Sequence, residues 1–546
     1  MFPAKVVILL FVHFVNTLVS SSSSTGGDRL IVDTGYAKYF GNLSYPDTVA
    51  YLGIPYAEPP LGDRRFRAPV PLDTGRITTA ARGQAINATF YPEPCIQGTT
   101  GAGDAGGAGS EDCLKVNIYS PTSGWNLPVL VYIHGGGYIY GNPANWPFDH
   151  WVHQSPNVVI VSVYYRLSSF GFLAHPDFAS SSEHGDLNVG FLDQIQALRW
   201  VKQHISSFGG DPGRVTINGQ SAGGSSVELH LVAHEGEQLF SGAIAQSVYR
   251  AAVPSPEQQK PLFDFYAGKT GCGIGDLASQ MDCLRNASIG DLARAQDSSL
   301  YIQMVRISGP YYAFHPVIDG KFLTEHPTTA IVSGRFARVP LIVGSTSNET
   351  SVTSLDIGQT LKHFYPGLDD VDVDEYLAAY PSSDFDSELQ RLFVLGGETV
   401  FICARSILGT AYSSAGLKSW AYRYNQPNPT SSDPTTVAHA AENWMMFLGT
   451  NTGFNGTTTF SPMTAEEKAF AEELIAYWLS FVRAKNPNTF KLKRSPIWNG
   501  YAADSKDQIV LQQNTTTTSG SFVELELQKD GDRCRFVASK AEKELN

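Results

Sequence analysis

Ser221 is the side chain best placed to act as a nucleophile. It stands in GQSAG (219–223), after a β-branched run at 215–217 and before a helix-forming segment at 225–233. A strand that turns sharply into a helix exposes such a serine hydroxyl at the top of a sheet, and flanking glycines avoid crowding by a Cβ. A G-x-S-x-G string alone arises by chance, but this context favours a catalytic serine over a plain Gly/Ser turn.

A glycine run supplies a second requirement of acyl transfer. A serine hydroxyl needs a base, a carboxylate that orients the base, and hydrogen-bond donors for the oxyanion that forms. HGGG (134–137) directly follows an apolar run that ends at Ile133. We expect the backbone N–H groups of Gly136 and Gly137, with that of Ala222, to form an oxyanion hole. The alternative interpretation is a flexible glycine turn.

Near-continuous apolar runs predict the sheet that must position these groups. They lie at residues 129–133, 158–163, 215–217, 244–247 and 339–344. Such runs, alternating with helices, indicate strands that are covered on both faces. The clearest helix spans 192–208, with apolar residues at helical spacing and two glycines after its end. The predicted fold class is α/β, with a mostly parallel sheet.

Composition narrows the class of protein. The 546 residues are 42% hydrophobic and 17% charged, as in a folded globular protein. The formal charge of −13 and the lack of a long basic cluster argue against nucleic acid as a partner. Length alone suggests several domains, yet no interdomain linker or internal repeat is present. We therefore predict one domain over residues 21–546.

Residues 1–20 have the features of a secretion signal. Lys5 supplies the positive start, the apolar run at 6–15 is interrupted only by His13, and small residues begin at Ser20. The run is shorter than the roughly 20 residues of a membrane span, and no other segment approaches that length. We expect a secreted protein without a transmembrane segment. Six N-glycosylation sequons agree with this route, at Asn42, Asn87, Asn286, Asn348, Asn455 and Asn514.

Six cysteines in an exported chain suggest disulfides. Their spacing favours two local pairs, Cys95 with Cys113 and Cys272 with Cys283. Cys403 and Cys534 are left, either paired over a long span or free and buried.

Motifs spread from about residue 30 to the C-terminus carry a resemblance to a known family. They are HGGG (134–137), EDCL (111–114), GQSAGG (219–224), IPYAEPP (54–60), YRL (165–167), SFGGDP (207–212) and PVIDG (316–320). Together they resemble the type-B carboxylesterase/lipase family, a branch of the α/β-hydrolases that also contains the cholinesterases. The resemblance implies the α/β-hydrolase fold and a carboxylic ester hydrolase that requires no cofactor.

The resemblance also implies the acid of a catalytic triad, in the order serine, acid, histidine. Glu349 lies in GSTSNET (344–350), after an apolar strand, and this segment resembles the family's acid loop. Thr350 stands where the family often has glycine. The alternative for Glu349 is a surface glutamate. Asn348 abuts this acid, and because a buried catalytic loop could not carry a glycan, we predict that Asn348 is unmodified.

His439 is the base that the resemblance implies. It begins HAAE (439–442), which matches the family motif of a histidine followed three residues later by a glutamate. His13 lies in the signal and His134 in the oxyanion turn, so neither is a candidate; an ordinary loop histidine remains the alternative for His439. His230 and His234, one helical turn apart, would need a third ligand to bind zinc, and no H-E-x-x-H is present. We predict no metal site.

Structural pairs follow from the same resemblance. It implies two ion pairs and a third disulfide: Arg65 with Glu111, Arg166 with Asp193, and Cys403 with Cys534.

The segment between Cys95 and Cys113 bears on the substrate. Lipases of the family carry an amphipathic lid here, and cholinesterases a tryptophan that binds a cation. Residues 98–110 contain only Gly, Ala, Thr, Asp and Ser, which favours a general carboxylesterase acting on small-molecule esters. A lipase or sterol esterase with a lid between 253 and 307 is one alternative; a non-catalytic binding protein is another. Residues 311, 312 and 314, all aromatic, are either acyl-pocket walls or core.

Overall fold

The structure is a computed structural model that describes residues 30–97, 109–234, 236–304, 314–349, 354–452 and 458–546. The predicted signal at 1–20 and most of the loop between Cys95 and Cys113 therefore lie outside the described residues.

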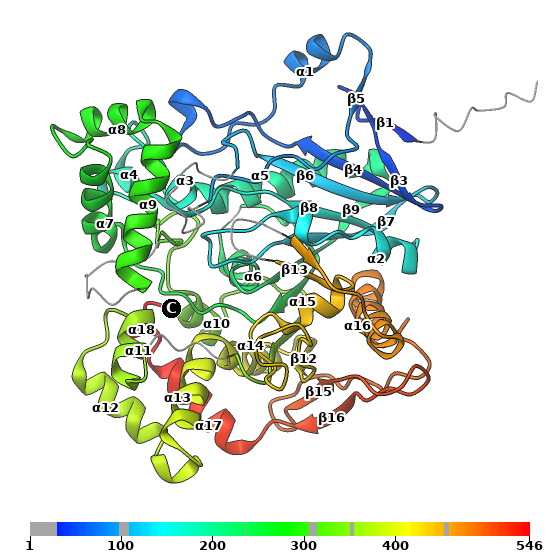
Figure 1. Ribbon diagram of the computed structural model, residues 1–546, viewed down its shortest axis with the longest axis vertical. Coiled ribbons are helices and arrows are strands. Elements are labelled where there is room, and N and C mark those ends of the chain that lie inside the picture. Colours follow the sequence, from blue (N-terminus) through cyan, green and yellow to red (C-terminus); the bar gives the residue numbers. More distant parts are fainter. Residues whose placement is uncertain (1–29, 98–108, 235, 305–313, 350–353, 453–457) are drawn as a thin grey trace, which may run out of the picture.

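An 11-stranded sheet forms the centre of the molecule, in the order β16-β15-β12-β11-β10-β9-β7-β8-β6-β4-β3 (Figure 1). Its strands are β3 (Asn42–Tyr45), β4 (Thr48–Pro55), β6 (Lys115–Pro121), β7 (Leu127–Ile133), β8 (Val159–Val163), β9 (Gly210–Gln220), β10 (Gly242–Gln246), β11 (Leu341–Thr346), β12 (Ser419–Tyr424), β15 (Asp507–Leu511) and β16 (Phe522–Leu525). Neighbours from β8 to β15 pair in parallel, whereas β6, β4 and β3 on one side and β16 on the other pair antiparallel. The predicted α/β class with a mostly parallel sheet is confirmed.

Alternate residues of the central strands pack into two separate cores. In β7, Val131 joins one hydrophobic cluster, and Leu130 and Tyr132 join the other. Because successive side chains of a strand point to opposite faces, both faces of the sheet are buried. The five apolar runs that predicted strands correspond to β7, β8, β9, β10 and β11.

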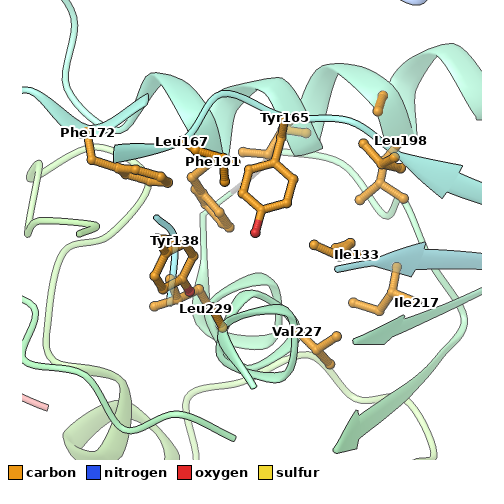
Figure 2. Close-up of a cluster of buried hydrophobic side chains, with 14 of the residues drawn as sticks. Ile133, Tyr138, Tyr165, Leu167, Phe172, Phe191, Leu198, Ile217, Val227 and Leu229 are labelled. Atoms are coloured by element: carbon orange, nitrogen blue, oxygen red, sulfur yellow. The ribbon is translucent and has the colours of Figure 1, made fainter. Parts of the chain in front are cut away.

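Helices cover both faces of the sheet. The first core receives α5 (Val189–His204) and α6 (Ala222–Val232). Figure 2 shows Leu198 of α5 and Val227 of α6 near Ile133 and Ile217 of the strands, and Leu229 of α6 beside Tyr138. The second core receives α2 (Asp149–Gln154), α15 (Ala441–Met446) and α16 (Ala465–Ala484). The helix predicted at 192–208 is α5 continued by the 3-10 turn η4 (Ile205–Phe208), and it ends at Gly209 in a left-handed conformation as its sequence indicated.

Further elements surround this frame. The helices are α1 (Thr74–Ala81), α3 (Ser168–Phe172), α4 (Pro176–Ser180), α7 (Pro256–Lys269), α8 (Leu277–Asn286), α9 (Ile289–Met304), α10 (Pro327–Val332), α11 (Ile357–Phe364), α12 (Asp370–Ala379), α13 (Glu388–Gly397), α14 (Cys403–Ser414), α17 (Gln528–Ser539) and α18 (Ala541–Glu544). Short turns are η2 (Gly62–Arg64), η3 (Pro143–Asn145), η5 (Ser382–Asp384) and the π-helical η6 (Glu398–Ile402). The strands β1 (Ile31–Asp33), β2 (Lys38–Phe40) and β5 (Ala85–Asn87) form a small sheet, and β13 (Thr450–Thr452) pairs with β14 (Thr458–Phe460).

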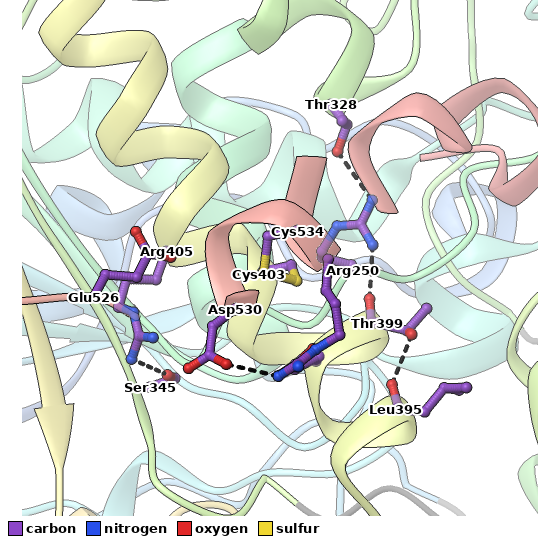
Figure 3. Close-up of a disulfide and its surroundings, with 12 residues drawn as sticks. Arg250, Thr328, Ser345, Leu395, Thr399, Cys403, Arg405, Glu526, Asp530 and Cys534 are labelled. Carbon is purple, nitrogen blue, oxygen red and sulfur yellow. Dashed lines mark hydrogen bonds and ion pairs between the residues drawn. A yellow bond between two sulfur atoms is a disulfide. The ribbon is translucent and has the colours of Figure 1, made fainter. Parts of the chain in front are cut away.

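Covalent and ionic pairs join distant segments. Three disulfides are present, Cys95–Cys113, Cys272–Cys283 and Cys403–Cys534. The third links α14 to α17, as Figure 3 shows. Both ion pairs that the resemblance implied are formed and buried, with bidentate geometry in Arg65–Glu111 and Arg166–Asp193.

One continuous helical stretch among the described residues, Glu388–Ser414, is long and apolar enough to cross a membrane by length and composition alone. Inside the fold, 83% of its apolar window is buried. That burial is typical of a core helix, so the stretch is weak evidence for a membrane span.

Candidate active site

Ser221 occupies the sharp turn between β9 and α6. Its backbone has φ 61° and ψ −123°, outside the common regions for a residue with a Cβ. The turn is held by its N–H, which donates to the Gln246 carbonyl of β10 at 2.9 Å. A Cβ on Gly219 would lie 2.3 Å from the Gly223 backbone, and one on Gly223 would lie 2.0 Å from the Ile133 carbonyl oxygen. The two glycines are therefore required by close backbone approach.

Three side chains from distant segments meet in a chain of two hydrogen bonds. The His439 Nε2 atom lies 2.9 Å from the Ser221 Oγ atom, and His439 Nδ1 lies 2.5 Å from Glu349 Oε2. His439 lies in the loop that leads into α15. Ser221 follows β9, Glu349 follows β11 and the loop of His439 follows β12. Because these strands are parallel, the segments after their carboxyl ends lie at one edge of the sheet.

Burial and hydrogen bonding determine the protonation state of Glu349. Glu349 has no solvent exposure, and it accepts hydrogen bonds from the Ser247 hydroxyl at 2.5 Å and the Thr346 N–H at 2.7 Å. Burial acts to raise the pKa of Glu349, but its interactions with His439 and these donors outweigh burial and bring the pKa below its ordinary value.

His439 remains partly open to solvent, with 27% of its side chain exposed. Burial acts to lower the pKa of His439, but the charge and hydrogen bond of Glu349, and the charge of Glu442, raise the pKa above its ordinary value of 6.5. A neutral histidine bonded in this way to a carboxylate can accept the proton of a neighbouring hydroxyl.

The glycine run after β7 packs directly against the serine turn. A Cβ on Gly135 would lie 2.3 Å from the Gln220 carbonyl oxygen and 2.9 Å from the Ser221 Cβ. Gly136 and Gly137 have φ of 108° and 61°. Within the described part of the chain, the N–H groups of Gly136, Gly137 and Ala222 donate to no other group. They are available to an anion beside Ser221.

Two residues of the site carry no signal in the sequence. Phe401, from the π-helical turn η6, lies with its ring centroid 4.2 Å from that of His439. His315, next to the PVIDG motif, lies with Nε2 3.1 Å from the Gly137 carbonyl oxygen. Both contacts join segments far apart in the chain, so no local spacing could reveal them.

Glu442 is a buried carboxyl group close to the histidine. It is 2% exposed, and neither of its carboxylate oxygens has a hydrogen-bond partner among the described residues. Burial, followed by the charge of Glu349, raises the pKa of Glu442 to about 7. The Glu442 backbone N–H, the His439 ring and the Gln246 side chain oppose this shift without outweighing burial. The family motif located Glu442, but its burial could not be foreseen from sequence.

The premise of our prediction at Asn348 is wrong. Asn348 is exposed to solvent, whereas the adjacent Glu349 is fully buried. Successive side chains of this turn point in different directions, so burial of the acid does not extend to its neighbour. Burial therefore gives no reason to exclude a glycan at Asn348. Thr350, the last residue of that sequon, lies outside the described residues.

The remaining predicted positions have ordinary surroundings. Phe314 is buried against Tyr266 at a centroid distance of 5.4 Å, which favours the core interpretation; Tyr311 and Tyr312 lie outside the described residues. His230 contacts Gln194, and His234 contacts Thr324. Within the described ranges, no three His, Cys, Asp or Glu side chains are grouped to hold a metal ion.

Comparison with known proteins places this geometry in a family. The carboxylesterase family profile matches residues 31–536. Carboxylesterase 1E of Rattus norvegicus is 30% identical over 548 residues, covering 91% of this chain and 92% of that protein. Acetylcholinesterase of Bungarus fasciatus is 28% identical, covering 87% and 80%. Chlorogenic acid esterase of Aspergillus niger is 33% identical, covering 62% and 66%.

A solved structure agrees over nearly the whole length. The crystal structure of Aspergillus niger EstA has a TM-score of 0.80 and 29% sequence identity, and the match covers 94% of this chain and 99% of that one. The chain has the α/β-hydrolase fold and belongs to the carboxylesterase family of carboxylic ester hydrolases.

Proposed function

We propose that the protein hydrolyses carboxylic esters through an acyl-enzyme intermediate on Ser221, with His439 as general base and Glu349 as the orienting acid. The observation that carries this proposal is the pair of hydrogen bonds joining Ser221 to His439 and His439 to Glu349. Unengaged N–H groups beside the serine support the oxyanion hole of Gly136, Gly137 and Ala222.

In the first half of the reaction, the Ser221 Oγ attacks the ester carbonyl carbon while its proton passes to His439 Nε2. The carbonyl oxygen becomes an oxyanion, held by the three backbone N–H groups. The intermediate then collapses: the bond to the alcohol oxygen breaks, and His439 returns the proton to the departing alcohol. Glu349 stabilises the imidazolium that exists between the two transfers.

In the second half, water takes the place of the alcohol. His439 removes a proton from the water as it attacks the acyl carbon, and the oxyanion forms again in the same hole. Collapse breaks the bond to Ser221 Oγ, which regains its proton from His439, and the carboxylic acid leaves. The exposed edge of His439 supports access of water to this position.

For the substrate, we propose small-molecule carboxylic esters. The relatives bear names as different as acetylcholinesterase and chlorogenic acid esterase, so these names favour no single ester. The polar, small-residue composition of the segment 98–110 supports a general carboxylesterase. Lipase activity is the alternative, and the test below distinguishes it.

The experiment measures hydrolysis of p-nitrophenyl esters from acetate to palmitate, with emulsified triglyceride in parallel. Wild type and Ser221→Ala are compared. We expect hydrolysis of short esters by wild type and its loss in Ser221→Ala, by at least about 10³-fold. Activity that survives in the variant would rule out the serine mechanism. If the rate of triglyceride hydrolysis rises sharply once the triglyceride forms an emulsion, the result would support a lipase and contradict the proposed general carboxylesterase.

We also propose that residues 21–546 form one secreted domain after removal of the signal at 1–20. Three disulfides support an oxidising compartment. The sequon asparagines in the described ranges are all exposed: Asn42, Asn87, Asn286, Asn348 and Asn514. N-terminal sequencing of protein recovered from culture medium tests the proposal, which requires a start near residue 21.

A further inference from the structure

We infer that His315 is a positioning residue for the oxyanion hole: its side chain fixes the backbone on the far side of Gly137. The inference rests on the proposed function, because it concerns how that hole keeps its shape. His315 lies just before the PVIDG motif and far in sequence from the glycine run, and no motif or resemblance assigned it a role.

The oxyanion loop is held by its carbonyl groups. Each of the five consecutive carbonyl groups from His134 to Tyr138 accepts a hydrogen bond. The donors, in order, are the Tyr165 hydroxyl, the His134 ring, the N–H groups of Ile139 and Tyr140 together, the His315 ring and the Ser168 N–H. With these carbonyls engaged, the N–H groups of Gly136 and Gly137 are left for an anion. Two of these donors are side chains from outside the loop: Tyr165, which holds the His134 carbonyl, and His315, which holds the Gly137 carbonyl and comes from much further along the chain.

Packing does not hold Gly137 in the way that it holds the preceding glycines. A Cβ on Gly136 would lie 2.0 Å from the Tyr140 carbonyl oxygen, and one on Gly135 would lie 2.3 Å from the Gln220 carbonyl oxygen beside the serine turn. At Gly137 the nearest atom to a Cβ, among described residues other than its two chain neighbours, would be 3.8 Å away, in Ile139. Among the described residues, contacts at the Cα position therefore restrain Gly137 less than they restrain the two glycines before it, and glycine itself adopts many backbone conformations. The bond from His315 supplies the restraint that packing does not.

The surroundings of His315 suit a fixed donor. Its ring is 7% exposed and lies between Tyr138 and Tyr249, at centroid distances of 5.6 Å to each. Burial lowers the pKa of His315 to about 4. The His315 ring is therefore neutral throughout the pH range in which His439 is neutral and can act as the base. The proton sits on Nε2, since the Gly137 carbonyl can only accept. Tyr249, which follows β10, also donates its N–H to the Ser221 carbonyl at 3.4 Å. The His315 ring therefore packs between the oxyanion loop and a segment that contacts the serine turn.

Two substitutions separate the hydrogen bond from the ring. His315→Phe keeps an aromatic ring between the two tyrosines and removes the donor. His315→Gln places an N–H at similar reach and removes the ring. Both are compared with wild type and Ser221→Ala, and the active sites are counted by titration to the end point with a p-nitrophenyl phosphonate, so that misfolded protein does not enter kcat.

The readouts are kcat and KM for p-nitrophenyl butyrate and the inhibition constant of a trifluoromethyl ketone, which binds serine hydrolases as a tetrahedral oxyanion. For His315→Phe we expect kcat to fall about 10-fold with KM changed less than about 2-fold, because the loop matters most when the oxyanion forms. The ketone should bind about 10-fold more weakly, and the acid limb of the pH profile should not move. His315→Gln should recover most of the loss.

Three results would overturn the inference. The first is an unchanged kcat in His315→Phe. The second is a fall in kcat in His315→Phe without a loss of affinity for the ketone. The third is a kcat in His315→Gln as low as that of His315→Phe when the two variants have equal thermal stability. Failure of the proposed function looks different. There Ser221→Ala would keep its activity, whatever the His315 variants do.

Discussion

At the scale of single residues, two carboxyl groups act on His439. Glu349 bonds to its Nδ1 atom, and Glu442 lies three residues further along the chain, buried and without a hydrogen-bond partner in the described structure. Both raise the pKa of His439. The base must be neutral to accept the serine proton, so kcat/KM is lost as pH falls through a pKa that lies above the ordinary 6.5.

Glu442→Gln should move this acid limb toward lower pH. Where Glu442 is ionised, its negative charge favours protonated His439, so the substitution makes His439 easier to deprotonate. Because the pKa of Glu442 is itself about 7, this charge is only partly present across the acid limb, and we expect a shift of less than about one pH unit. The measurement is the pH dependence of kcat/KM for p-nitrophenyl butyrate. Glu228→Gln is the matched control, because Glu228 is equally buried and its pKa is also raised to about 7, without contributing to the pKa of His439. An acid limb that stays in place or moves to higher pH contradicts the account.

At the scale of elements, the site depends on how closely β7 approaches the turn between β9 and α6. Gly223→Ala would place a Cβ 2.0 Å from the Ile133 carbonyl oxygen, and a backbone atom cannot yield as a flexible side chain can. We expect activity to fall by at least about 100-fold, together with a lower unfolding temperature. Gly268→Ala is the control: it lies in α7 with no atom within 4 Å of the added Cβ, so it should keep activity and match or exceed wild-type stability. Equal behaviour of the two variants would contradict the packing argument.

The disulfide between α14 and α17 should contribute more to stability than the disulfide beside α8. Cys403 and Cys534 are 131 residues apart, whereas Cys272 and Cys283 are 11 apart. In the chain-entropy account, closing the long loop contributes about 4–5 kcal/mol and the short loop about 3 kcal/mol. Replacing each pair by alanines and measuring unfolding in urea should give the larger loss for Cys403 and Cys534. The reverse order would show that strain or residual structure outweighs chain entropy here.

At the scale of the whole molecule, local patterns predicted the five central strands but missed β4, β6, β12 and β15, which are also largely buried. The strands β7 to β11 are near-continuous apolar runs, and α5 has a clear helical period. The outer strands escaped prediction because their signals are weaker: β16, with the sequence FVEL, has no buried residue, and β3 is likewise only partly covered. The triad positions came from family motifs. Phe401 and His315 could not be found, because their contacts exist only after distant segments meet.

Surface exposure gives a prediction for the secreted molecule. Asn42, Asn87, Asn286 and Asn514 are all exposed, so an oligosaccharide could be attached to each without displacing the core. We expect peptide mass spectrometry of protein from a eukaryotic host to detect glycans at these sites, and treatment with an amidase that removes N-glycans to lower the mass. Secreted protein without a glycan at any sequon would contradict the proposed route.

The most direct test of the triad is chemical labelling. A p-nitrophenyl phosphonate transfers its phosphonyl group to the oxygen that attacks it and releases p-nitrophenolate. The account predicts one p-nitrophenolate per active site, the phosphonyl group on the peptide that contains Ser221, and loss of ester hydrolysis in proportion to labelling. His439→Ala should slow the labelling by at least about 10³-fold, because the base is missing. Label on another residue, or full activity in a molecule labelled at Ser221, would contradict it.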